Sequence, residues 1–86
     1  MTMIEAFERV LEILLLPKFD RLKDVDVSKG ERFFEPTVKV TFLCTDRIDY
    51  QDDYWIKKET NSLFDMMGFE KELKLNVEYQ FEEDSF

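Results

Sequence analysis

The sequence predicts an α+β domain in which two helices cover one face of a three-stranded, mostly antiparallel sheet. Two segments have apolar residues at three- and four-residue steps, and three others alternate apolar with polar residues. Their order along the chain is α-β-β-α-β. Because amphipathic helices bury their apolar stripe against the apolar face of a sheet, this order predicts a two-layer sandwich. A chain of 86 residues forms one domain, residues 1–86.

The first predicted helix covers residues 3–16. Thr2 and Glu5 have the spacing of a capping box, in which each side chain accepts a hydrogen bond from the other's backbone amide. Pro17 ends the pattern because it disfavours helical geometry at the residue before it. The apolar residues on one side of this helix are Met3, Phe7, Val10, Leu11, Leu14 and Leu15.

Residues 18–36 predict a β-hairpin whose register is not readable from the sequence. Val25 and Val27 alternate with aspartates, as in a short strand. Residues 28–31 have the chemistry of a turn, and Gly30 can adopt the positive φ that tight hairpin turns use.

Phenylalanines occur in segments that the pattern assigns to turns. We expect Phe19, Phe33 and Phe34 to close the edge of a core that is small and needs its aromatic residues. The alternative is an exposed apolar patch that serves self-association or a partner.

A strand, a helix and a final strand complete the prediction. Val38, Val40, Phe42 and Cys44 share one strand face. The second helix runs from about residue 52 to residue 67, with an aspartate at its start suited to capping and Gly68 suited to end it in the left-handed conformation. Residues 73–81 alternate strictly and predict a long strand with one wet face.

Negative charge is concentrated in the second half of the chain. Residues 1–44 carry seven Lys/Arg against eight Asp/Glu, whereas residues 45–86 carry five against twelve and so hold a net charge of −7 out of −8. An acidic region repels nucleic acid and anionic membranes and attracts basic partners. We therefore expect the partner to be another protein, basic or nucleic-acid-binding, with no direct contact to nucleic acid or membrane.

The residue types present exclude most catalytic chemistry. Without histidine, and with Cys44 alone, the chain lacks the commonest general base, a zinc site of the usual type and a Cys-His pair. We expect Cys44 to be a small buried hydrophobe and not a reactive thiol. A single cysteine also fits a reducing compartment, which predicts a cytoplasmic protein. The sequence thus predicts a non-enzymatic protein without a cofactor.

The richest candidate site is the stretch of residues 46–55, in which aromatic and acidic residues interleave. Tyr and Trp are the residues that most often anchor protein interfaces. A second acidic group lies on the wet face of the last strand and continues into Glu83 and Asp84. The predicted partner-binding residues are Asp46, Asp49, Tyr50, Asp52, Asp53, Tyr54, Trp55, Glu78 and Glu82. The other interpretation of residues 46–55 is a solvated loop with helix-capping aspartates.

These observations favour a small acidic protein-interaction module of the inhibitor or adaptor type, as phages and other mobile elements often encode. Two alternatives stay open. One is a structural subunit of a homomeric or phage virion (head or tail) assembly, with contacts through Phe33, Phe34 or an edge strand. The other is a carboxylate-based metal-dependent site for Mg²⁺ or Ca²⁺, although the calcium-loop pattern is missing.

Overall fold

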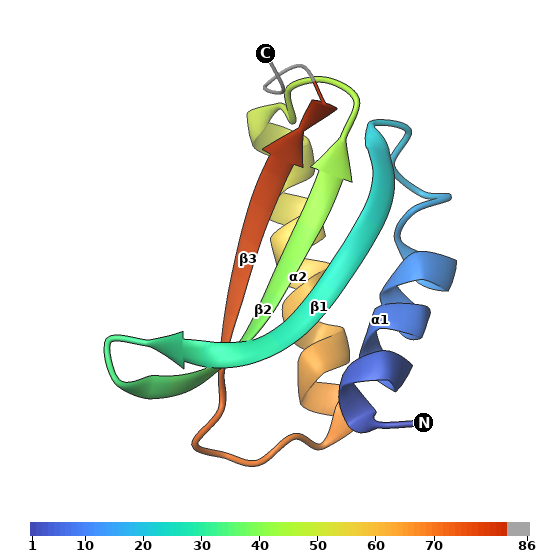
Figure 1. Cartoon of the computed structure of the whole chain (residues 1–86). Coiled ribbons are helices and arrows are strands. Elements are labelled where there is room, and N and C mark those ends of the chain that lie inside the picture. The colour runs from blue at the N-terminus through green and yellow to red at the C-terminus, as the bar shows by residue number, and fades with distance from the viewer. Residues whose placement is uncertain (83–86) are drawn as a thin grey trace.

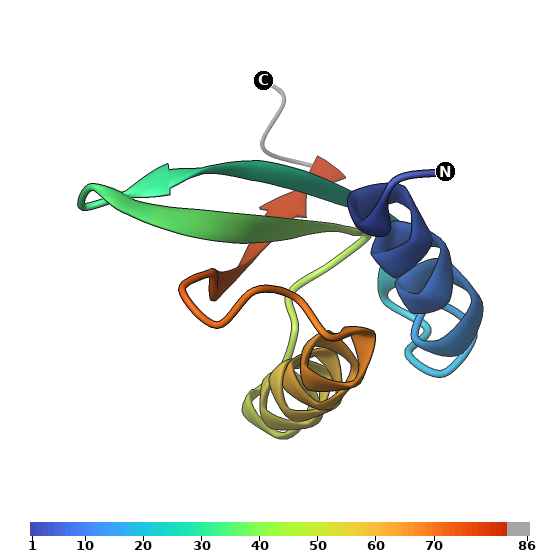
Figure 2. The same ribbon diagram turned by 90° about the horizontal axis from the view of Figure 1, so that it is seen from below.

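The protein has two helices and three strands in the predicted α-β-β-α-β order. The computed structural model describes residues 1–82, so the expected continuation of the acidic group into Glu83 and Asp84 lies outside the described residues. The elements are α1 (Met3–Leu14), β1 (Leu22–Arg32), β2 (Glu35–Cys44), α2 (Tyr50–Met67) and β3 (Lys74–Phe81) (Figure 1). Both helices lie on the same side of the sheet (Figure 2). The predicted α+β class and two-layer arrangement are confirmed.

The sheet is mixed, with strand order β1-β2-β3. β1 and β2 form an antiparallel hairpin, whereas β3 pairs with β2 in parallel after the chain has crossed the sheet through α2. Val40 marks the centre of the sheet, because it lies between Val27 on β1 and Val77 on β3. Within residues 1–82, no helix or strand covers the opposite face of the sheet, which we call the open face (Figure 2).

The core fills the space between the sheet and the helices. The predicted inward face of β2 is fully buried, including Cys44, and burial raises the pKa of the Cys44 thiol above its usual value. α1 contributes Phe7 and Leu11, and α2 contributes Ile56. Phe69, which follows α2, stacks on Phe64 at a ring distance of 4.9 Å. The interpretation of Cys44 as a buried hydrophobe is confirmed.

The helix ends follow the capping signals in the sequence. The predicted capping box of α1 is present, with Thr2 Oγ1 accepting from the Glu5 amide at 3.1 Å. α1 ends at Leu14, two residues before the predicted end, and passes into a turn. α2 begins at Tyr50, two residues earlier than predicted, and ends at Met67 as predicted, followed by Gly68 as the C-cap with a positive φ of 75°.

α1 also covers the free edge of β1. The Glu8 side chain accepts a hydrogen bond from the Val27 amide at 2.9 Å. An edge strand presents unpaired backbone groups that invite pairing with another chain. Glu8 therefore satisfies one of these donors from within the molecule.

The hairpin turn differs from the predicted one. The ladder of β1 and β2 continues to the pair Arg32 and Glu35, so Phe33 and Phe34 are the two turn residues. Both have positive φ, 51° and 65°, as a two-residue type I′ turn requires. Gly30 lies inside β1 instead, because the register that aligns the core valines continues the pairing past it.

The phenylalanines of this turn do not close the core. Phe33 is 83% exposed and Phe34 is 96% exposed, so the expectation for these two residues is wrong. Phe19 alone of the three packs against the core. Once the turn is placed at residues 33 and 34, their side chains lie beyond the layer that the helices cover.

Candidate protein-interaction surface

The first two turns of α2 present three aromatic side chains to solvent. Tyr50 is 91% exposed, Tyr54 is 54% exposed and Trp55 is 46% exposed. Ile56 and Thr60 of the same helix are fully buried and fix which side faces the core. The rings therefore lie on the outward side, where Tyr50 and Tyr54 are one helical turn apart. We call Tyr50, Tyr54 and Trp55 the α2 aromatic surface.

Two rings of the α2 aromatic surface already hold a cation from the same chain. Tyr54 and Trp55 meet edge to face at 5.3 Å between ring centres. The Lys58 ammonium lies 5.7 Å from the centre of the Tyr54 ring and 5.0 Å from that of Trp55. Such contacts contribute about 0.5–1 kcal/mol at exposed positions. The pair of rings is thus arranged to bind a positive charge.

Four predicted aspartates surround the start of α2. Asp49 is the N-cap residue, and its side chain accepts from the Asp52 amide at 2.8 Å. Asp53 accepts from the Tyr79 hydroxyl at 2.7 Å and pairs with Lys57 at 3.3 Å. Asp46 is exposed and its side chain accepts from the amide of the next residue. The positive end of the helix dipole stabilises carboxylates at this place. Asp49 and Asp53 therefore have structural roles as well as charge.

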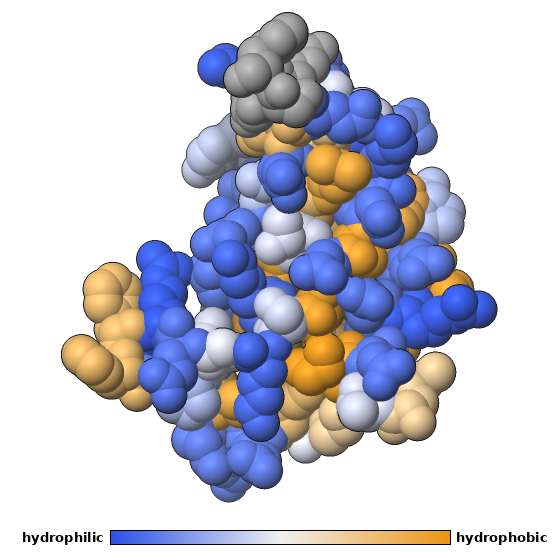
Figure 3. Space-filling model, viewed as in Figure 1, coloured by the Kyte–Doolittle hydropathy of each residue, from blue (hydrophilic) through white to orange (hydrophobic). Residues whose placement is uncertain are grey.

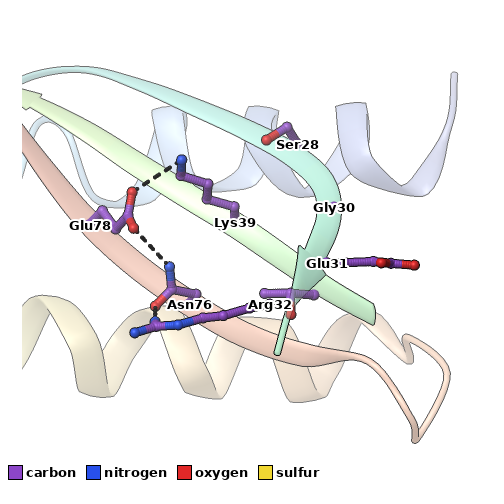
Figure 4. Close-up of a pocket in the computed structure, with 8 residues that line it drawn as sticks. Ser28, Gly30, Glu31, Arg32, Lys39, Asn76 and Glu78 are labelled. Carbon is purple, nitrogen blue, oxygen red and sulfur yellow. Dashed lines mark hydrogen bonds and ion pairs between the residues drawn. The ribbon is translucent and has the colours of Figure 1, made fainter. Parts of the chain in front are cut away.

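The two predicted glutamates belong to other surroundings. Glu78 lies on the open face of the sheet, where it pairs with Lys39 at 3.3 Å (Figure 4). This contact and a hydrogen bond from Asn76 lower the pKa of Glu78. Glu82 follows β3 and pairs with Lys23 of β1 at 2.7 Å. Because the helices cover the other face of the sheet, Glu78 does not join residues 46–55 in one surface.

A polar network that the sequence did not suggest crosses the open face. Arg32, near the end of β1, donates to Asn76 of β3 at 2.6 Å, and Asn76 donates to Glu78 at 3.1 Å (Figure 4). A cavity of about 300 Å³ lies beside these residues. It is lined by Ser28, Gly30, Glu31, Arg32, Thr37, Lys39, Asn76 and Glu78. The hydrogen bond from Arg32 to Asn76 ties the hairpin to β3.

The end of the hairpin extends beyond the three-stranded sheet. β3 begins to pair with β2 at Thr37, so the ribbon from Gly30 to Pro36 has no third strand beside it. A two-stranded ribbon alone is marginally stable in water. In Figure 3 its tip is an isolated hydrophobic group that projects from a mostly hydrophilic face. The left-handed conformation of Phe33 and Phe34 costs about 1–2 kcal/mol per residue, since neither is glycine.

Within residues 1–82, no three carboxylate or thiol groups converge into a set that can hold a metal ion. No helix in the same part of the chain is long and apolar enough to cross a membrane.

Comparison with known proteins identifies a structural neighbour. No protein-family model matches the chain, and no curated protein matches it in sequence. The fold is similar to that of the MamB CTD, a magnetosome protein of Desulfamplus magnetovallimortis BW-1, with a TM-score of 0.66. The match covers 92% of this chain and 91% of that chain, with 22% sequence identity. The likeness shows a shared fold over nearly the whole length of both chains.

Proposed function

We propose that this protein is a small protein-interaction module that binds a basic partner, as an inhibitor or adaptor, through the α2 aromatic surface. The observation that carries the proposal is the exposure of Tyr50, Tyr54 and Trp55 beside the aspartates at the start of α2. Exposed aromatic rings close to one another are typical anchors of interfaces. The similarity to the MamB CTD over 92% of this chain supports the compact fold of the module.

The chemistry of the surface specifies the partner. Lys58 shows within the chain how a cation sits against Tyr54 and Trp55. An arginine or lysine of the partner would take the same place, with Asp46 and Asp52 attracting further positive charge. Proteins that handle nucleic acid carry such basic side chains, so they form the expected partner class. A cytoplasmic location and the absence of catalysis stay predictions from the sequence.

Site-specific photocrosslinking in cells of the organism that encodes the chain tests the proposal. A benzophenone amino acid at position 50 is expected to capture a basic protein, which mass spectrometry identifies. Position 66 is the matched control, because Met66 is 81% exposed near the other end of the same helix. Equal capture from both positions, or capture of acidic proteins only, would contradict the proposal.

The captured protein then allows a quantitative test with purified components. Replacing Tyr54 and Trp55 by alanine is expected to weaken its binding by at least about tenfold, the effect of truncating one interface anchor. Asp46→Asn together with Asp52→Asn removes charge while leaving the Asp49 side chain as cap. It is expected to weaken binding chiefly at low salt, because exposed charges are screened as ionic strength rises. Binding that neither pair of substitutions changes would assign the contact to another surface.

A further inference from the structure

An apolar cavity lies at the end of the molecule that also carries the hairpin tip. The cavity has a volume of about 390 Å³ and lies between the start of α1 and the segment that joins α2 to β3. That volume is within the range of sites that enclose small molecules, about 300–1,000 Å³. The apolar residues that line it are Met3, Ile4, Phe69 and Leu73, and the charged ones are Lys29 and Glu70.

The hairpin tip carries two of the most exposed large apolar side chains in residues 1–82, the part of the chain that the structure describes. Phe33 and Phe34 combine nearly full exposure with a backbone conformation that aromatic residues adopt at a cost. A turn of Asn and Gly would form the same hairpin without either disadvantage. Within the chain, the Arg32 guanidinium lies 5.5 Å from the centre of the Phe33 ring. Such a contact at an exposed position contributes about 0.5–1 kcal/mol, which is less than the cost of the two positive φ angles, so the rings point to an apolar site outside the protomer.

The tip cannot enter the cavity of its own chain. Lys29 of β1 lines the cavity, and Phe33 lies four residues further along, about 13 Å away in an extended strand. In Figures 1 and 2 the hairpin tip projects to the left of the molecule, whereas the start of α1 lies at the right. The tip can therefore enter this cavity only in another copy of the chain.

The two features are complementary in chemistry. Phe69 in the cavity lies 5.5 Å from Phe7 and stacks on Phe64, so an incoming ring would extend an existing aromatic cluster. Arg32 flanks the tip and Glu70 lines the cavity. Glu31 and Glu35 also flank the tip, and Lys29, which has the opposite charge, lines the cavity. Both signs of charge are thus matched around an apolar centre.

We infer that two copies of this chain associate about a two-fold axis, each inserting its Phe33–Phe34 tip into the cavity of the other. A two-fold axis produces two identical contacts, because each subunit supplies one tip and one cavity. The α2 aromatic surface takes no part in this contact. Self-association and binding of a basic partner therefore succeed or fail independently.

Sedimentation velocity over a wide range of protein concentration tests the inference. The wild-type chain is expected to dimerise. Phe33→Asn with Phe34→Gly removes the rings. Met3→Glu places a carboxylate at the cavity, and the helix should tolerate it because acidic side chains are favourable at a helix start. Each variant is expected to weaken the dimer by at least about 100-fold. Tyr50→Glu is the matched control, because Tyr50 is the first residue of α2 as Met3 is of α1, and it should dimerise normally.

Mixing the two variants distinguishes tip exchange from any other dimer. The Met3→Glu chain keeps its tip and the double variant keeps its cavity, so a heterodimer restores one of the two contacts. The mixture should therefore associate more tightly than either variant alone. A wild-type chain that stays monomeric, or variants that dimerise normally, would overturn the inference. A monomer that binds phosphatidylcholine vesicles only with both rings present would also overturn it and assign the tip to a membrane surface.

Discussion

The hydroxyl group of Tyr79 on β3 donates a 2.7 Å hydrogen bond to the carboxylate of Asp53 on α2. It joins the last strand to the helix that precedes it in the chain. Tyr79 is half-buried beside Phe42 of the core strand. Burial and this hydrogen bond raise the pKa of Tyr79 well above its ordinary value.

Replacing Tyr79 by phenylalanine should destabilise the protein in a pH-dependent way. At neutral pH we expect a loss of about 1.5–3 kcal/mol in the free energy of unfolding, since the bond has a charged acceptor. The folded pKa is raised above the unfolded value of about 10, so the contribution is complete below that pH and is lost as pH rises through the folded pKa. Urea unfolding followed by circular dichroism at neutral pH and at about pH 11 measures this.

Tyr50→Phe is the control for that experiment, because the Tyr50 side chain is almost fully exposed. The difference in the free energy of unfolding between wild type and Tyr79→Phe should become smaller at alkaline pH. The corresponding difference between wild type and Tyr50→Phe should stay constant. A constant difference for both variants would show that the Tyr79 hydroxyl is not held as described.

Relaxing the hairpin turn should stabilise the monomer. Phe33→Asn with Phe34→Gly supplies residues that accept positive φ, and we expect about 2 kcal/mol of added stability. The measurement is urea unfolding at a low protein concentration, at which self-association does not contribute. A double alanine variant at the same positions removes the rings but keeps the strain, and it should not gain this stability. Equal gains in both variants would attribute the effect to lost aromatic surface.

Two substitutions at Asp49 separate its capping role from its charge. Asp49→Ala should lower the free energy of unfolding by about 1 kcal/mol, because it removes the acceptor for the Asp52 amide. Asp49→Asn keeps a hydrogen-bond acceptor at the N-cap, so its free energy of unfolding should be close to that of the wild type. Thermal unfolding of the three proteins makes the comparison. If alanine and asparagine are equally harmful, the charge of Asp49 matters more for stability than its hydrogen bond.

The Cys44 thiol should be protected in the folded state. It is fully buried, and its pKa is raised by burial, so little reactive thiolate forms at neutral pH. Ellman's reagent is expected to react slowly with the native protein and rapidly in concentrated urea. Rapid reaction without denaturant would mean that β2 opens far more often than its packing implies.

The amphipathic pattern of the sequence predicts the helices and strands of this fold. The errors of prediction occur where that pattern does not decide the structure. Residues 38–44 were placed correctly because each alternate side chain is buried against a helix. The turn was misplaced because the conformational freedom of Gly30 outweighed register in the prediction, whereas pairing of the core valines decides it. Strict alternation in β3 fits a parallel or an antiparallel neighbour equally well. The sequence therefore could not show that β3 pairs in parallel.

The candidate site divides for a simple geometric reason. Residues 46–55 stay together because they are consecutive and lead into one helix. Glu78 was predicted on the wet face of the last strand, and a wet face is the one that the helices do not cover. A surface on a helix and a surface on the open side of the sheet therefore cannot merge in a two-layer fold. The Arg32–Asn76 hydrogen bond joins residues 44 positions apart on β1 and β3, a contact that no local sequence pattern encodes.

Trp55 is the single tryptophan of the chain, and it lies on the outer side of α2 instead of in the core. Its fluorescence will therefore report events at the helix surface, such as displacement of the Lys58 ammonium by an incoming ligand. The same signal will be a poor measure of global denaturation, because the indole is half solvated before the chain opens. Emission and circular dichroism recorded together would thus give two separate readouts, one of occupancy and one of folding.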